Sequence, residues 1–274
     1  MSAGPAMDAT SVAAAVLLAD HIKALKLPTF AREYDKVAAI AAQDRADYPR
    51  YLLRLCELER IDRERRMVER RIRQARFPQV KSLDTLDFAA QPSLNKALVL
   101  ELARGDWLQR RSNVVALGPS GTGKTHLALA LGLAACQKGY SVAFVTAAAL
   151  VHELMEARDE RRLRKLQQHL ASVKLLIIDE LGYVPFTAVG AELLFEILSQ
   201  RYERASTLIT SNLPFDEWTS VFGSERLTGA LLDRLTHHVN ILEMNGDSYR
   251  LAASAKRQKQ GKATTQEESP MTRN

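Results

Sequence analysis

The stretch "ALGPSGTGKTHLALALG", residues 116–132, joins a short apolar run to a glycine-rich turn and then to a helical pattern of alanine and leucine. Gly118, four further residues and then Gly123-Lys124-Thr125 complete the P-loop signature. In this arrangement a strand leads into a turn whose backbone N–H groups point inward. The following helix presents its positive N-terminal end to the same place. We therefore expect a phosphate-binding site at the centre of an α/β fold.

The P-loop signature predicts what each of its residues contacts. The Lys124 ammonium would reach the β- and γ-phosphates of ATP, and the Thr125 hydroxyl would ligate Mg²⁺. A glycine-rich turn without a ligand is the alternative, and Lys-Thr at the required offset argues against it. The expected ATP-binding residues of this segment are Gly118, Pro119, Ser120, Gly121, Thr122, Gly123, Lys124, Thr125 and His126.

From residue 113 onwards, apolar runs alternate with helical segments. The runs lie at 113–117, 141–147, 173–180, 206–212 and 238–244. This alternation predicts a parallel five-stranded sheet with helices packed on it, over residues 113–251. The last residues, 252–274, show no apolar periodicity, and we expect them to form a disordered tail.

Two acids end the buried run "LLIIDE", at the edge of the sheet where ligands bind in open α/β folds. Asp179 is suited to hold Mg²⁺, and Glu180 to orient and deprotonate the attacking water. The alternative is a strand end capped by solvated acids. An adjacent base favours a hydrolase over a kinase, because hydrolysis needs an activated water.

Two further polar residues follow later runs. Asn212 ends "LITSN" and would lie beside the γ-phosphate if its strand neighbours 113–117, although asparagine is also a common turn residue. Arg234, in "LLDRLTHH", lies near the polar edge of an expected helix. Its side chain would pair with residues that neighbour Asp233 or project towards another subunit.

The N-terminal part of the chain predicts a small all-helical domain. Apolar residues at helical spacing run through 20–76, and Pro28 and Pro49 divide this region into short helices. We expect residues 1–19 to be flexible. Residues 77–112 read as a linker that leads to a helix ending near Gly105.

Arginines dominate the end of this helical region, with eight between residues 60 and 76 against three acids. Ion pairs such as Asp62–Arg66 and Glu69–Arg73 on a solvated face are one explanation. Guanidinium groups also bind phosphate bidentately, and the scarcity of aromatic residues favours double-stranded DNA over single strands. The expected DNA contacts are Arg60, Arg63, Arg65, Arg66, Arg70, Arg71 and Arg73.

Composition sets wider limits on the function. The net charge of +6 and the pI near 9.4 point towards acidic partners such as nucleic acid. The sequence has no apolar run long enough for a membrane span and no basic residue before its first apolar patch, so we expect no membrane partner and a cytoplasmic protein. Cys56 and Cys136 lack metal-ligand spacing, and we expect both to be small buried apolar residues.

"GPSGTGKT", "LLIIDE", "LITSN", "LLDRL" and "GDSYRL", in this order, resemble the AAA+ ATPases of the initiator and helicase-loader branch. The resemblance is closer to the IstB-like transposition helper ATPases. "LKLPTFAREYD" and "ERRIRQARFPQVKSLDTLDFAAQPSL" look like the N-terminal region of that family and its junction with the ATPase core. The resemblance covers about residues 20–251.

By this resemblance, Asn212 is the sensor of the γ-phosphate and Arg234 is the arginine finger supplied to a neighbouring subunit. Arg250, in "DSYR", is a second sensor that contacts the nucleotide. Arg226, in "GSERLTGA", is a rival candidate for the finger. The implied catalytic residues are Glu180, Arg234 and Asn212, with Thr125 and Asp179 at the metal.

The family resemblance also implies a function. Its members form homo-oligomers on DNA and, with a cognate transposase, promote ATP-regulated insertion. A replicative helicase loader of the DnaC type is the alternative within the same fold, and its N-terminal region would contact a helicase. A nucleotide kinase would need an acceptor site, and an architectural DNA-binding protein would not need Lys124 and Glu180.

Overall fold

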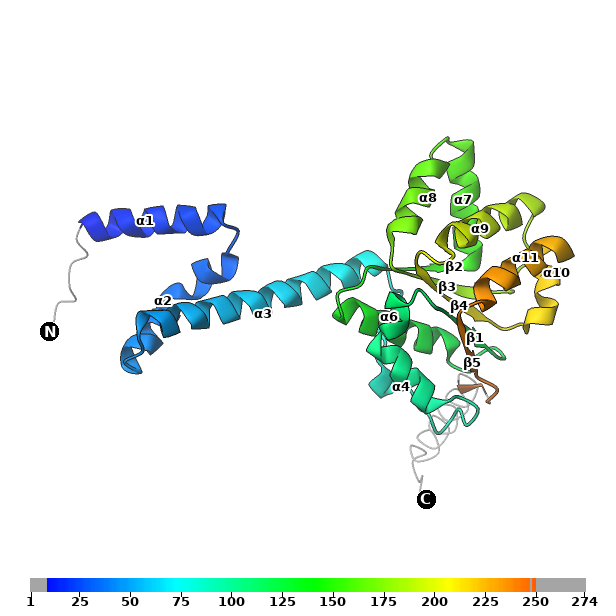
Figure 1. Cartoon of the computed structure of the whole chain (residues 1–274), viewed down its shortest axis with the longest axis horizontal. Coiled ribbons are helices and arrows are strands. Elements are labelled where there is room, and N and C mark those ends of the chain that lie inside the picture. Colours follow the sequence, from blue (N-terminus) through cyan, green and yellow to red (C-terminus); the bar gives the residue numbers. More distant parts are fainter. Residues whose placement is uncertain (1–8, 247, 250–274) are drawn as a thin grey trace, which may run out of the picture. The chain divides into compact units, whose positions relative to one another are not determined.

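The computed structural model describes residues 9–246, 248 and 249, and these form two compact units that divide between Glu69 and Arg70 (Figure 1). The division falls inside a helix, seven residues before the domain boundary expected from the sequence. Residues after that point pack into the second unit, where Ala75 is fully buried. The expected tail, 252–274, lies outside the described residues.

The first unit is helical, as predicted. Its helices are α1 (Ala9–Ala24), α2 (Pro28–Gln43) and α3 (Tyr48–Ala75), of which α3 continues past the end of the unit. Both prolines stand in the first turn of a helix, where the missing N–H costs nothing. Two details differ from our expectation. The alanine-rich segment is helical from Ala9 rather than from residue 20, and α3 is 28 residues long rather than short.

The second unit is built on a sheet of five parallel strands, which confirms all five predicted strands. Their order across the sheet is β2-β3-β4-β1-β5. β1 therefore lies between β4 and β5, and its carboxyl end meets those of both neighbours. The strands are β1 (Asn113–Leu117), β2 (Val142–Thr146), β3 (Leu175–Leu181), β4 (Ser206–Ser211) and β5 (Val239–Glu243).

Alternating side chains of the strands form two hydrophobic cores, one on each face of the sheet. Figure 1 shows the helices on either side of the strands. Ile177 and Leu208 pack on the first face, and Ile178 and Ile209 on the second. The first face is covered by α4 (Lys96–Arg104), α5 (Asp106–Gln109) and α6 (Lys124–Gln137). The second is covered by α7 (Ala147–Asp159), α8 (Leu163–Ser172), α9 (Ala188–Arg201), α10 (Trp218–Phe222) and α11 (Glu225–Thr236).

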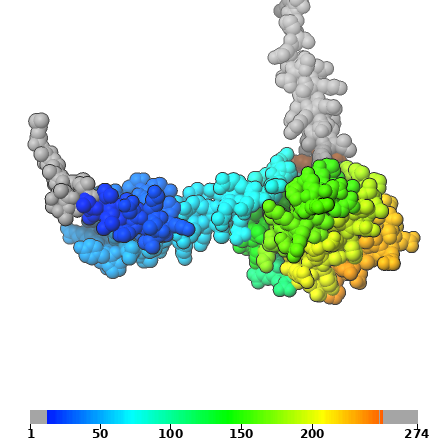
Figure 2. Space-filling model, turned by 90° about the horizontal axis from the view of Figure 1, so that it is seen from above, coloured from blue at the N-terminus to red at the C-terminus, as the bar shows by residue number. Residues whose placement is uncertain are grey.

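The segments coloured green to orange in Figure 2 form most of the visible surface of the second unit. Two short 3-10 helices, η1 (Leu83–Thr85) and η2 (Phe215–Glu217), lie in its connections. The helix predicted to end near Gly105 is α4, and Gly105 caps it in a left-handed conformation with φ of 83°. This is the usual role of glycine at a helix end.

The two cysteines differ in their surroundings. Cys136 is buried in the core beneath the sheet, and burial raises the pKa of its thiol to about 11, so it behaves as the small apolar residue that we expected. The expectation is wrong for Cys56, which is exposed because it lies on a solvated side of α3. Within the described residues, no helix combines the length and apolar character needed to cross a membrane.

Candidate functional site

The P-loop turns sharply between β1 and α6, and close packing from the end of β5 requires glycine at two of its positions. A Cβ on Gly118 would lie 2.2 Å from the main-chain oxygen of Met244, and one on Gly121 would lie 2.2 Å from Ser248 Oγ. Their φ angles, 147° and 85°, also disfavour any other residue. The chain after β5 therefore packs directly on the P-loop, and Tyr249 N donates to Gly121 O at 3.0 Å.

Lys124 and Thr125 begin α6 at the floor of the site. Lys124 Nζ donates to the main-chain oxygens of Gly118 and Pro119, at 2.6 and 2.7 Å, so the ammonium lies across its own loop. Thr125 Oγ1 lies 3.0 Å from each carboxylate oxygen of Asp179. The structure thus brings together the P-loop and the acid predicted to hold Mg²⁺.

Thr210 on β4 connects the two acids at the end of β3. Its hydroxyl donates to Asp179 Oδ1 at 2.5 Å and accepts from the backbone N–H of Glu180 at 3.0 Å. Asp179 is buried, whereas Glu180 is exposed and lines the pocket. This change of direction depends on a local irregularity, because the strand register shifts between Ile178 and Leu181 and Glu180 has a φ of 61°. A positive φ at glutamate is uncommon, and such strain occurs often at functional sites.

These residues surround a pocket of about 370 Å³, within the usual range for small-molecule sites. Ser120, Gly121, Thr122, Gly123, Lys124, Thr125 and His126 all line it, as do Glu180 and Asn212. Asn212 follows β4, which does neighbour β1, and its Oδ1 is buried without a hydrogen-bond partner among the described residues. A buried amide oxygen without a partner is costly and suggests that a donor binds there.

Three parts of the pocket were not predicted from the sequence. Thr210 is one, and no signal in the sequence pointed to it, because most residues of its strand are polar. Tyr183 is the second, and its hydroxyl lies 2.7 Å from Ser120 Oγ, joining the loop after β3 to the P-loop. The third is the segment 78–91, which we read as a linker and which supplies wall residues such as Pro78, Leu86 and Asp87.

His126 contacts this wall. Its Nε2 lies 3.0 Å from Thr85 Oγ1 and 3.2 Å from the main-chain oxygen of Ser82. His126 lines the pocket as predicted, but its ring bonds to the 78–91 segment. It therefore positions that wall against the P-loop.

Arg234 is not among the described residues that line this pocket. Its guanidinium lies over the ring of Phe195 on α9, with Cζ 5.0 Å from the ring centre, and Nη1 donates to Ala230 O at 2.8 Å. Arg226 is exposed in the first turn of the same helix, α11. Arg250 lies outside the described residues.

The arginines of α3 fall into two groups. In the first unit, Arg63 and Arg66 pair with the buried Glu59 at 3.4 and 2.9 Å, and Arg65 pairs with Asp62 and Glu69 at 3.2 and 2.9 Å. Burial acts to raise the pKa of Glu59, but hydrogen bonds from Thr29 and Arg66 outweigh it and the pKa is lowered. By contrast, none of the described acids forms an ion pair with Arg60, Arg70 or Arg73.

Four of the seven predicted DNA contacts are less available than expected: the paired Arg63, Arg65 and Arg66, and Arg71. Arg71 is half-buried, and its Nε is enclosed near the Cys136 thiol, where its charge weakly opposes the burial effect on the pKa of that thiol. Arg66 donates to the main-chain oxygen of Asp62 at 3.2 Å, whereas we considered the Asp62 carboxylate. The exposed and unpaired arginines are therefore the better candidates.

The residues present fit a nucleotide with a bound Mg²⁺. The Thr125 hydroxyl and the Asp179 carboxylate are hard oxygen donors of the kind that Mg²⁺ prefers. The P-loop brings an ammonium group and a helix N-terminus to one end of a pocket of suitable size.

The sheet order, the P-loop and the paired acids define a nucleotide-binding protein of the AAA+ type. Residues 20–257 match the family described as IstB-like ATP binding protein. The chain belongs to this family. An insertion sequence IS21 ATP-binding protein from Pseudomonas aeruginosa is 40% identical to this chain, and the match covers 85% of this chain and 88% of the relative. An insertion sequence IS5376 ATP-binding protein from Geobacillus stearothermophilus is 38% identical, and the match covers 85% of this chain and 92% of the relative.

Solved structures agree on the fold. AMPPCP-bound DnaA from Aquifex aeolicus matches with a TM-score of 0.53 and 21% identity, over 67% of this chain and 55% of that one. The replication initiator DnaA bound to AMPPCP and single-stranded DNA matches with a TM-score of 0.51 and 21% identity, over 63% and 52% of the two chains. At this level of identity the match supports the fold alone.

Proposed function

We propose that this protein is the ATP-dependent helper of an insertion-sequence transposase, and that it assembles on double-stranded DNA and hydrolyses ATP to regulate target selection. The observation that carries the proposal is the bonded network of Thr125, Asp179 and Thr210, with Glu180 directed into the same pocket. The names of the relatives support the setting, since several are ATP-binding proteins of insertion sequences.

Each residue of the pocket would have its own task in hydrolysis. Lys124 would leave the loop carbonyls and neutralise phosphate charge. Thr125 and Asp179 would hold Mg²⁺, which would supply further positive charge against the phosphates. Glu180 would orient and deprotonate a water for attack on the γ-phosphate. The amide NH₂ of Asn212 would donate to the γ-phosphate and so distinguish ATP from ADP. Leu86 of the 78–91 segment and Leu129 of α6 line the same pocket and would contact the nucleoside.

Assembly on DNA is the second part of the proposal. Arg60, Arg70 and Arg73 on α3 offer guanidinium groups that the described acids do not neutralise, and these would bind phosphates of the DNA backbone. Arg234, which does not line the pocket of its own chain, would be supplied to the ATP of a neighbouring copy. Its contact with Phe195 would then be exchanged for the phosphate.

Steady-state hydrolysis of ATP with Mg²⁺, measured with and without double-stranded DNA over a range of protein concentrations, tests this proposal. We expect turnover that rises with protein concentration, and DNA should raise it at low concentration because it gathers copies on one backbone. Turnover that is equal with and without DNA at every concentration would remove the DNA-assembled part. Binding of ATP without any hydrolysis would make the protein a nucleotide-dependent binding module.

A further inference from the structure

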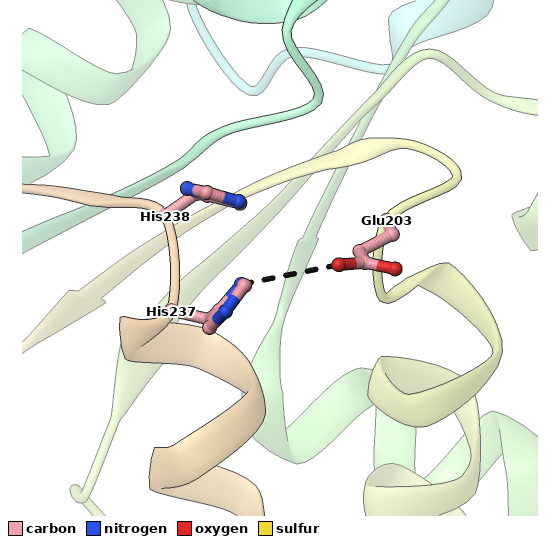
Figure 3. A group of neighbouring side chains, drawn as sticks. All are labelled: Glu203, His237 and His238. Carbon is pink, nitrogen blue, oxygen red and sulfur yellow. Dashed lines mark ion pairs between the residues drawn. The ribbon is translucent and has the colours of Figure 1, made fainter.

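A group of three side chains lies at the opposite edge of the sheet from the nucleotide pocket, where the strands begin. Glu203 belongs to the connection between α9 and β4, and His237 and His238 to the connection between α11 and β5. Figure 3 shows the carboxylate and the two imidazoles gathered between these connections. One possible ligand atom from each residue lies within 4.8 Å of the other two, and all three residues are exposed.

The backbone beneath these residues is held by the first residue of β1, Asn113, and by Arg111 just before the strand. Arg111 Nη1 donates to the main-chain oxygen of Glu203 at 2.7 Å, and Asn113 N donates to that of His238 at 2.7 Å. The Asn113 side chain also bonds to Leu235 O and accepts from Thr207 N. The two connections are therefore fixed relative to each other.

The imidazole rings retain their capacity for a ligand. Among the described residues, neither His237 nor His238 forms a side-chain hydrogen bond. The rings contact each other at 4.3 Å between centroids, and His237 also contacts Tyr202 at 5.9 Å. His237 Nδ1 lies 3.9 Å from Glu203 Oε1, which is too long for a hydrogen bond and weak as an exposed ion pair.

Two imidazole nitrogens and one carboxylate form the donor set of many open zinc sites, with the remaining position left to water. Nitrogen donors select borderline ions of the zinc, cobalt and nickel type over Mg²⁺ and Ca²⁺, which prefer oxygen alone. We infer that Glu203, His237 and His238 form a binding site for a divalent transition-metal ion, best suited to Zn²⁺.

A bound ion would join the ends of α9 and α11. These two helices carry Phe195 and Arg234, which contact each other, and Arg234 precedes His237 by less than one helical turn. The ion would therefore stabilise the pair of helices that holds this arginine. This inference does not depend on ATP hydrolysis, since the site is built from other residues.

The test is a titration of the nucleotide-free full chain with Zn²⁺ against a chromophoric chelator, with excess Mg²⁺ to occupy oxygen-ligand sites. We expect one strongly bound ion per chain. His237→Ala and His238→Ala should each weaken binding by at least the roughly 10–100-fold that loss of even an outer partner of a metal site costs. Glu203→Gln, which keeps the size of the side chain, should weaken it in the same direction.

His152→Ala is the matched control, because His152 also lies near an acid, Glu156, at 3.2 Å on an exposed helix face. It should leave the affinity for Zn²⁺ unchanged. Thermal unfolding supplies a second readout: Zn²⁺ should raise the Tm of the wild type and of His152→Ala, but not that of the His237→Ala/His238→Ala double variant. Equal affinity and an equal Tm rise in the wild type and the double variant would overturn the inference.

Discussion

The nucleotide pocket and the arginine-rich part of α3 both carry strong sequence signals, but their side chains are bonded in different ways. In the pocket, Thr125, Asp179 and Thr210 come from three separate elements and bond directly to one another. On α3, Arg65 bonds to acids of its own helix, and Arg66 pairs with the buried Glu59.

This difference shows which kind of signal specifies a site. A motif whose members are distant in sequence gains meaning when the fold brings them together, because few arrangements satisfy all their bonds. A run of arginines along a helix specifies only a charged face. The acidic residues that pair with these arginines decide how many positive charges remain available to a partner. The following predictions test this contrast.

The largest expected effect concerns Arg234. Arg234→Ala should leave ATP affinity close to wild type, because Lys124, Thr125 and Asp179 belong to the binding chain. It should lower turnover by roughly 10³–10⁵-fold, as the loss of an arginine finger does in other phosphoryl-transfer proteins. Measured kcat and ATP affinity decide this, with Arg226→Ala on the same helix as the matched variant.

Mixing two inactive variants tests whether this arginine acts between copies. An Arg234→Ala chain still binds ATP and can receive the intact arginine of a Lys124→Ala neighbour, so a mixture on DNA should recover part of the activity. Absence of recovery in confirmed mixed assemblies would place the arginine within its own chain. Loss of turnover in Arg226→Ala alone would transfer the role to Arg226.

Lys124→Ala tests the pocket at its floor. Loss of a charge-assisted contact to phosphate costs roughly 1.5–3 kcal/mol, so ATP affinity should fall about ten- to a hundredfold. Binding of a fluorescent ATP analogue measures this. Lys138→Ala, at the exposed far end of α6, should bind the analogue like the wild type. Wild-type affinity in Lys124→Ala would mean that the loop does not hold the phosphates.

The arginine prediction separates the unpaired from the paired groups. Each phosphate contact contributes about 0.9 to the slope of log affinity against log salt, so replacing Arg60, Arg70 and Arg73 by Ala should flatten that slope by about 3. Replacing Arg63, Arg65 and Arg66 should change the slope less, because these arginines already form ion pairs with Glu59, Asp62 and Glu69. Equal changes in the two triple variants would show that the acids do not limit DNA binding.

The smallest expected effect is the response of the first unit to acid. The hydrogen bond from Arg32 is the main cause that lowers the pKa of Asp62 from 3.8 to about 2. Because the folded pKa is depressed, this pairing stabilises the fold above about pH 3.8, and its contribution disappears as the pH falls towards 2. A carboxylate NMR titration of Asp62 should give the low midpoint, and Arg32→Ala should raise it. An ordinary midpoint in the wild type would mean that the pairing does not persist in solution.

Local patterns in the sequence predicted the strands and the P-loop well. Each strand is an apolar run with its own boundaries, and the spacing from Gly118 to Thr125 is set by one turn. Asp179 and Glu180 were placed correctly because they end a buried parallel strand, and the carboxyl ends of such strands meet at one edge.

The remaining parts of the site depend on which segments become neighbours. Thr210 joins Asp179 to Glu180 only because β4 lies beside β3, and strand order is not visible in a single sequence. The segment 78–91 reads as a linker by composition, and it lines the pocket because it packs near α6. The prolines do divide the region into helices, but the expected helix length was wrong, because α3 has Pro49 in its first turn and is 28 residues long. The roles of all the predicted site residues, Asp179 and Glu180 included, stay predictions.

Hydrolysis of bound ATP in Glu180→Gln, followed in a single turnover on double-stranded DNA, tests the central claim most directly. The substitution keeps the shape of the side chain and removes the proton acceptor. The account predicts wild-type ATP affinity, hydrolysis slower by about 10²–10⁴-fold, and an ATP-bound assembly that persists on DNA. Hydrolysis at the wild-type rate would contradict it, because the exposed acid beside Asp179 would then have no part in activating water.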